Sequence, residues 1–224
     1  MHLLAIETAT ETVSVALSIN GEVRERYEHA PRQHAELLLP WVEQMMAEAQ
    51  LGFGSLDAIA FSRGPGSFTS LRIGIGVVQG LAWASDTPVV PVSSLAATAQ
   101  TAVDDGVTSA LVALDARMNE VFACTFEAND NKIMVPTSEE RVCDPQDIQL
   151  SDDSEMFGIG IGFDRYEALG ILAERLAGVQ ANIWPKASSV LQLAQEWLKS
   201  HEPLTSEQAQ PVYLRNNVAK KQSA

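Results

Sequence analysis

The chain has 224 residues, of which 46% are hydrophobic and 20% charged, a composition typical of folded proteins and not of disordered ones. It carries 29 acidic and 15 basic residues, for a net charge of −14. This charge repels phosphate backbones and argues against a protein that binds nucleic acid on its own. The longest apolar stretch, residues 73–84, is shorter than the roughly 20 residues of a membrane-spanning helix. We therefore expect a cytoplasmic protein without membrane contact.

The two halves of the chain repeat one pattern. Residues 3–17 and residues 111–125 each contain an apolar strand, an acidic residue, a short polar turn and a second strand. When the two runs are aligned, Glu7 falls on Asp115 and Val13 falls on Val121. A chance similarity between two ordinary hairpins is the alternative to a duplication.

A repeat at half of the chain length predicts two duplicated lobes. We expect the first lobe to comprise residues 1–104 and the second to comprise residues 105–224. The tail at residues 205–224 is a candidate to pack back on the first lobe.

Two helices are predicted in the first half, at residues 35–50 and 68–85. In the second helix Gly76, Gly80 and Ala84 recur every four residues and form one stripe of small side chains. A glycine inside a helix costs about 1 kcal/mol relative to alanine, so the stripe suits a place where another backbone comes close. That backbone belongs either to the protein's own sheet or to a partner helix. The candidate partner-binding residues are Leu38, Trp41, Met45, Phe68, Thr69, Arg72, Gly76 and Gly80.

An acidic residue ends the first strand of each predicted lobe, Glu7 in one and Asp115 in the other. In the actin–Hsp70–sugar-kinase architecture such residues face the cleft between the lobes, where a metal-bound nucleotide is held. That chemistry also needs glycines in the following turn, but residues 8–10 and 116–118 include none. Glu7, Thr8 and Asp115 are therefore candidates for a vestigial cleft, and carboxylates that cap a turn are the alternative. We expect no catalytic residue, cofactor or metal.

Two glycine-rich segments have further interpretations. Residues 64–67 read GPGS, but the phosphate-binding pattern GxxxxGKS/T is absent, so an anion could bind only at the following helix N-terminus. Residues 158–162 read GIGIG, which favours close packing of a strand on a helix over a cofactor loop. The helix predicted to follow spans residues 164–177.

The patterns HExxH and HxxxH are both missing, which disfavours a metallopeptidase.

The run FSRGPGSFTSLRIGIGVVQGLA resembles the TsaB family, which is also called YeaZ. The runs LLAIETATETVSVAL, LDARMNEVF and PVYLRNNVA add to the resemblance, which covers most of the chain in the family's order. It implies an α/β fold with two duplicated actin-like lobes (the ASKHA, ribonuclease-H-like class) and degenerate nucleotide motifs. It also implies a non-catalytic subunit whose first-lobe helices pair with a second copy when the chain is alone.

On this resemblance, the protein supports formation of N6-threonylcarbamoyladenosine at position 37 of ANN-decoding tRNAs. Its partners would be a TsaD-like catalytic subunit and a TsaE-like ATPase, and it would meet tRNA only through their complex. Two alternatives stay open. One is a nucleotide-dependent transferase or kinase that acts in the cleft of Glu7 and Asp115, and the other is a peptidase.

Overall fold

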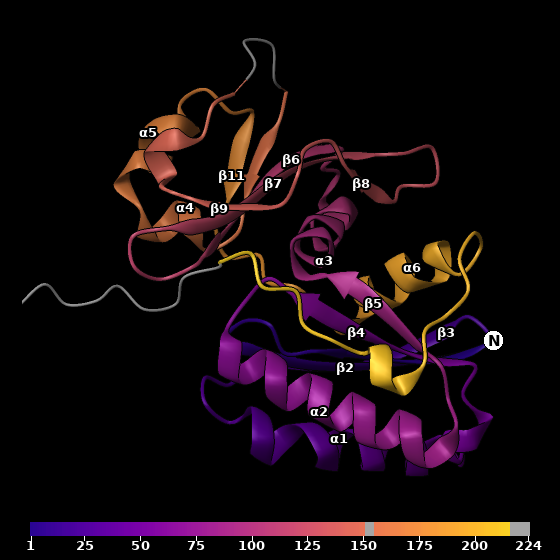
Figure 1. Cartoon of the computed structure of the whole chain (residues 1–224). Helices are drawn as coiled ribbons and strands as arrows, with labels where there is room; N and C mark the ends of the chain where they lie inside the picture. Colours follow the sequence, from indigo (N-terminus) through magenta and orange to yellow (C-terminus); the bar gives the residue numbers. More distant parts are fainter. Residues whose placement is uncertain (151–154, 216–224) are drawn as a thin grey trace, which may run out of the picture.

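The protein folds into two lobes, each built on one mixed β-sheet (Figure 1). The computed structural model describes residues 1–150 and 155–215, so residues 216–224 of the predicted tail lie outside the described part. The first sheet has the order β3-β2-β1-β4-β5, with strands β1 (His2–Glu7), β2 (Thr12–Ile19), β3 (Glu22–His29), β4 (Ala58–Gly64) and β5 (Val89–Ser93). The second has the order β11-β10-β6-β7-β8, and β9 also pairs with β7; its strands are β6 (Ser109–Asp115), β7 (Val121–Ala128), β8 (Met134–Pro136), β9 (Arg141–Cys143), β10 (Phe157–Ile159) and β11 (Gly178–Gln180).

The two sheets share one topology. In the first sheet β2 runs antiparallel to β1, and β4 lies parallel on the other side of β1. In the second sheet β7 runs antiparallel to β6, and β10 lies parallel on the other side of β6. Glu7 and Asp115 end the two equivalent strands. The predicted two-lobed α/β fold with duplicated lobes is therefore confirmed.

Helices cover both faces of the first sheet. Helices α1 and α2 lie side by side on one face, and α3 and α6 lie on the other, between the lobes (Figure 1). The remaining helices α4 and α5 pack on the second lobe. None of the helices within the described ranges is both long and apolar enough to cross a membrane. The helix bounds are α1 (His34–Glu48), α2 (Phe68–Ser85), α3 (Ser94–Thr101), α4 (Gly162–Arg165), α5 (Glu167–Ala173) and α6 (Ala187–Trp197).

Helix α6 comes from the second half of the chain but completes the core of the first lobe. Its buried residues Val190 and Leu191 pack with Leu3 of β1 and Val90 of β5. Helix α6 comes after residue 104 and yet covers the first sheet, so the first lobe includes a later segment of the chain. The lobe boundary expected between residues 104 and 105 stays a prediction.

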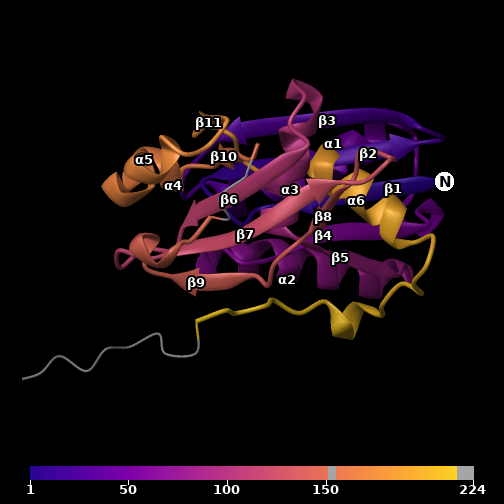
Figure 2. The ribbon, with the colours of Figure 1, turned by 90° about the horizontal axis from the view of Figure 1, so that it is seen from above.

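After α6 the chain runs back along the first lobe, beside α2 (Figure 2). The backbone of Leu204 exchanges hydrogen bonds of 2.8 and 2.9 Å with the backbone of Val89. Further on, the Gln79 side chain donates to the Ala209 carbonyl at 2.8 Å, and the Val212 amide donates to the Arg63 carbonyl at 2.8 Å. These bonds attach the end of the described chain to the first lobe.

The glycines of α2 divide into two kinds. A Cβ atom on Gly74 would lie 2.1 Å from the Thr8 hydroxyl, so Gly74 allows α2 to pack directly on the end of β1. A Cβ atom on Gly76 or Gly80 would have no neighbour within 4 Å. The stripe of small residues therefore does not pack on the protein's own sheet.

In the second lobe the structure contradicts one prediction, a helix, and agrees with another, the packing of a glycine run. The helix predicted at residues 164–177 is wrong, because Tyr166 takes an extended conformation (φ −120°, ψ 117°) that separates α4 from α5. In the GIGIG run, a Cβ atom on Gly158 would lie 2.6 Å from the Phe163 ring, and one on Gly162 would lie 2.8 Å from the Ala113 carbonyl. The run serves close packing, as predicted.

The two kinds of glycine predict opposite effects on stability. We expect Gly74→Ala to lower the free energy of unfolding by about 1–3 kcal/mol, because the new methyl group must displace Thr8. We expect Gly76→Ala to raise it by roughly 0.5–1 kcal/mol, because alanine favours the helix and meets no neighbour. Urea denaturation of both variants measures the difference, and an equal effect of the two substitutions would contradict the packing of α2 on β1.

Candidate functional site

Glu7 lies at the end of β1 and is fully buried. Its Oε1 atom accepts a hydrogen bond of 2.5 Å from the Ala9 backbone amide, and its Oε2 atom has no hydrogen-bond partner. Burial raises the pKa of Glu7 to about 7, although the Ala9 hydrogen bond acts to lower it. Next to it, Thr8 is 2% exposed and packs against Gly74. Enclosed in this way, Glu7 and Thr8 do not reach the space between the lobes.

Asp115 lies at the end of β6 and holds the turn that follows it. Its Oδ1 atom accepts hydrogen bonds of 2.7 Å from the Arg117 backbone amide and from the Tyr166 hydroxyl, and its Oδ2 atom pairs with the Arg165 guanidinium. Burial acts to raise the pKa of Asp115, but these hydrogen bonds outweigh it and hold the pKa below its usual range. The carboxylate is therefore ionised and fully engaged.

Glu7 and Asp115 cap equivalent turns in the two lobes. Each accepts a hydrogen bond from the backbone amide two residues further on, in Ala9 and in Arg117. This geometry agrees with the turn-capping interpretation of the two acids. A cavity lies between the two lobes. Of the vestigial cleft candidates, only Asp115 lines it.

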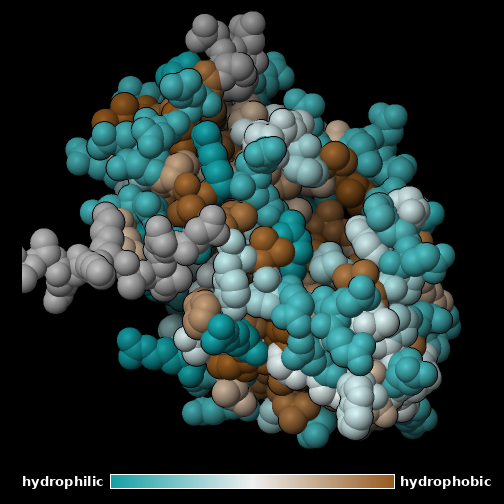
Figure 3. Space-filling model, viewed as in Figure 1, coloured by the Kyte–Doolittle hydropathy of each residue, from teal (hydrophilic) through white to brown (hydrophobic). Residues whose placement is uncertain are grey.

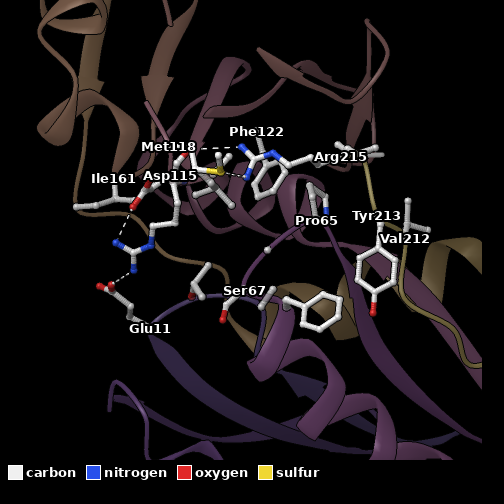
Figure 4. A pocket seen from close by; sticks show the side chains of 18 of the residues that line it. Glu11, Pro65, Ser67, Asp115, Met118, Phe122, Ile161, Val212, Tyr213 and Arg215 are labelled. Carbon is white, nitrogen blue, oxygen red and sulfur yellow. Dashed lines mark hydrogen bonds and ion pairs between the residues drawn. The ribbon is translucent and has the colours of Figure 1, made fainter. Parts of the chain in front are cut away.

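An ion-pair network joins the lobes at one end of this cavity (Figure 4). Glu11, in the turn after β1, lies 3.0 Å from the guanidinium groups of Arg117 and Arg165, which both belong to the second lobe. Arg117 also lies 3.1 Å from Asp115. Because Arg165 bonds both Glu11 and Asp115, it connects the first-strand turns of the two lobes directly.

One backbone amide at the start of α2 is already bonded. The Ser67 amide donates a hydrogen bond of 2.7 Å to the Ala9 carbonyl, and a Cβ atom on Gly66 would lie 2.2 Å from the same oxygen. A carbonyl oxygen in this position repels a phosphate group and occupies one of the amides that would bind it. The geometry therefore gives no support to anion binding at residues 64–67.

The predicted partner-binding residues divide between core and surface. On α1, Leu38 is 0% and Met45 4% exposed, and Trp41 is partly buried against the same core. Leu38 and Met45 therefore affect a partner only through the position of α1. On α2 the predicted residues are all exposed, namely Phe68, Thr69, Arg72, Gly76 and Gly80.

Trp83 extends this exposed surface and was missed by the sequence interpretation. It is 76% exposed, more than any other large hydrophobic side chain of the described residues. Its spacing of three residues from Gly80 places both on one helix face, so helical periodicity could have found it. We call the exposed residues Thr69, Arg72, Gly76, Gly80 and Trp83 the α2 face. Figure 3 shows hydrophobic side chains that reach the surface over α2.

The beginning of the α2 face is fixed by contacts with the tail. The Arg72 guanidinium lies 3.8 Å from the centre of the Phe68 ring, and its Nε donates to the Tyr213 hydroxyl at 3.1 Å. The rings of Phe68 and Tyr213 lie 5.3 Å apart. These three side chains form a small cluster between α2 and the cavity.

Comparisons with known proteins agree with this fold. The family model TsaD, tRNA N6-adenosine threonylcarbamoyltransferase, matches residues 26–223. The chain is 37% identical to the tRNA threonylcarbamoyladenosine biosynthesis protein TsaB of Escherichia coli, over 98% of this chain and 96% of that protein. It is 38% identical to TsaB of Haemophilus influenzae, over 97% and 95% of the two chains. The solved structure of YeaZ from Pseudomonas aeruginosa superposes with a TM-score of 0.87 at 40% identity, over 95% of this chain and 99% of that one.

The family model and the duplicated lobes define a protein of the TsaD-related class. Within that class, the two near-full-length relatives and the YeaZ structure show that the chain belongs to the TsaB family. The resemblance seen in the sequence is confirmed.

The buried carboxyl of Glu7 predicts a pH dependence of stability. Its pKa in the folded protein, about 7, exceeds the ordinary value of 4.5, so the folded state keeps a proton that the unfolded chain releases between these pH values. The stabilisation from the neutral carboxyl is therefore present at low pH and lost as the pH rises through about 7. We expect Glu7→Gln to remove this loss, a difference on the order of 3 kcal/mol between pH 5 and pH 8.

Urea denaturation at pH 5, 6, 7 and 8 measures this effect. The control is Glu43→Gln, which changes an exposed carboxyl on α1. An unchanged pH slope in Glu7→Gln would show that Glu7 is not held neutral in the folded protein.

Proposed function

We propose that this protein is a non-catalytic subunit in the biosynthesis of tRNA N6-threonylcarbamoyladenosine. In this role it binds and activates a TsaD-type catalytic subunit through the α2 face, with α1 beside it. Family membership supports the pathway, since the relatives are named for it. The observation that carries the binding role is the exposure of Gly76 and Gly80 in the middle of α2.

A second helix packed against α2 would explain the two glycines in its exposed face. Each weakens the isolated helix by about 1 kcal/mol, and no other part of the described chain lies within 4 Å of the position that a Cβ atom would take on either of them. A helix without side chains at these positions lets a partner backbone come close, and the exposed Trp83 offers a large apolar anchor beside them. The same face suits a second copy of the chain, so we propose a homodimer when the catalytic subunit is absent.

The state of the cleft supports a non-catalytic role. Glu7 is enclosed, Asp115 is engaged by the turn and by Arg165, and the Ser67 amide at the start of α2 is bonded to the Ala9 carbonyl. A phosphoryl-transfer enzyme needs these positions free to hold a metal and phosphate groups. We therefore propose that chemistry takes place on the TsaD-type partner.

The net charge of −14 supports tRNA contact only through the complex, because this chain repels a phosphate backbone. We propose that a TsaE-type ATPase joins the same complex, which works where tRNA is modified, in the cytoplasm.

The two alternative functions have direct tests. Micromolar binding of Mg-ATP to the isolated chain, measured by calorimetry, would favour a nucleotide-dependent transferase or kinase. Among residues 1–150 and 155–215, no three His, Cys, Asp or Glu side chains gather as metal ligands would. Proteolysis that follows the purified chain through every column step would favour the peptidase.

The proposed interface predicts that a large side chain on the α2 face blocks the complex. We expect Gly80→Leu to weaken binding to the TsaD-type subunit by at least about tenfold, because the leucine fills the space of the incoming backbone. The matched control is Gly170→Leu, which also lies in a helix with no neighbour within 4 Å of its Cβ position, but on α5. Co-elution on a sizing column, followed by titration calorimetry, measures the difference.

A charge reversal gives a second test of the same surface. We expect Arg72→Glu to block the complex as well, although it also loses its contacts with Phe68 and Tyr213. Its melting temperature must therefore be compared with that of the unmodified chain. Normal co-elution of both Gly80→Leu and Arg72→Glu would exclude the α2 face as the binding surface.

Reconstituted tRNA modification then tests the function itself. We expect the TsaD-type and TsaE-type subunits to modify tRNA with this chain and to lose most of that activity without it or with Gly80→Leu. Full activity without the chain would contradict the proposed role.

A further inference from the structure

A cavity of about 590 Å³ opens between the two lobes. Figure 4 shows Ser67 of the first lobe on one side of it, Met118 and Phe122 of the second lobe on the other, and Tyr213 of the tail at one end. This volume lies within the range of about 300–1,000 Å³ that is usual for small-molecule sites. The size of the cavity therefore suits a ligand larger than a single ion.

Large apolar side chains gather at this cavity and remain exposed. Phe68 is 46%, Met118 54% and Tyr213 42% exposed, and all three line the same space. They come from α2, from the turn between β6 and β7, and from the tail. Exposed apolar side chains that meet in a concave site mark a binding surface, because water is displaced from all of them at once.

The turn between β6 and β7 holds Met118 at the cavity in an unusual conformation. Arg117, Met118 and Asn119 have φ values of 61°, 57° and 60°, in the left-handed region that residues with side chains seldom occupy. The Asp115 carboxylate and a backbone bond of 3.0 Å from the Ala116 amide to the Glu120 carbonyl keep the turn in place. Strained residues of this kind gather at functional sites.

The charges around the cavity are balanced. Each arginine that lines it is already paired with a carboxylate, the pairs being Arg117 and Arg165 with Glu11 and Asp115, and Arg215 with Glu120. A polyanion would gain no net attraction and would have to break these pairs. An uncharged ligand leaves all of them intact.

We propose that this cavity binds a small, flat, uncharged ring compound that packs against the rings of Phe68 and Tyr213 and the thioether of Met118. The ligand touches both lobes and the tail, so it links the three parts of the chain. This site adjoins the α2 face, because Arg72 contacts both Phe68 and Tyr213, but its ligand does not depend on the proposed partner role.

Indole is a suitable probe because it is flat, uncharged and of a size that the cavity accepts. We expect indole to shift the backbone amide signals of Phe68, Met118 and Tyr213 in nitrogen–proton NMR spectra of the full chain, with saturation on titration. We expect Mg-ATP to bind about tenfold more weakly or not at all, since the arginines of the cavity are paired.

Substitutions of Met118 locate the site. We expect Met118→Glu to weaken indole binding about tenfold, and Met118→Leu to keep it within about twofold. The matched control is Ile171→Glu, which places the same charge at an apolar residue of α5 that is 65% exposed and does not line the cavity. Melting temperatures confirm that each variant is folded.

Three results of these experiments would overturn the proposal. They are the absence of saturable shifts in the unmodified chain, equal indole binding by Met118→Glu, and shifts that gather away from the cavity. Tighter binding of Mg-ATP than of indole would also overturn it, because the cavity would then be an anion site.

Discussion

One hydrogen bond, made once in each lobe, shapes the two turns that meet where the lobes join. In the first lobe the Glu7 carboxyl accepts it from the Ala9 amide, and in the second the Asp115 carboxylate accepts it from the Arg117 amide. The first turn then covers the start of α2 with the Ala9 carbonyl, and the second presents its arginine to Glu11. Both carboxyl groups are therefore used to hold the backbone of the turns that follow them.

The fold could be predicted where local signals agree. Helix α2 begins and ends at the predicted residues, because a glycine–proline break precedes it and Thr87-Pro88 follows it. The helix at residues 164–177 could not be predicted correctly, since Tyr166 has an extended backbone and its hydroxyl contacts Asp115, which is distant in the sequence. The place of α6 on the first sheet is a contact between distant parts of the chain, and periodicity within the helix carries no information about it.

The candidate site, too, could be predicted only where local patterns in the sequence determine it. Periodicity gathered Gly76, Gly80 and Ala84 on one face of α2, and all three are exposed, because side-chain direction on a helix follows from spacing alone. It could not show whether the apolar face of α1 meets the protein's own core or a partner, and Leu38, a candidate partner-binding residue, is buried in the core. The raised pKa of Glu7 comes from its burial, which depends on contacts between distant parts of the chain.

The position of α6 also has a consequence for synthesis of the protein. Leu3, Ala5 and Val90 are part of the first 93 residues, yet the helix that buries them ends at Trp197. On the ribosome, at roughly 5–20 residues per second, the first lobe waits several seconds for α6, with only α3 to cover that face of its sheet. During that time the strands of the second lobe are made. Until α6 packs on it, the nascent first lobe therefore exposes more apolar surface than it does in the finished protein.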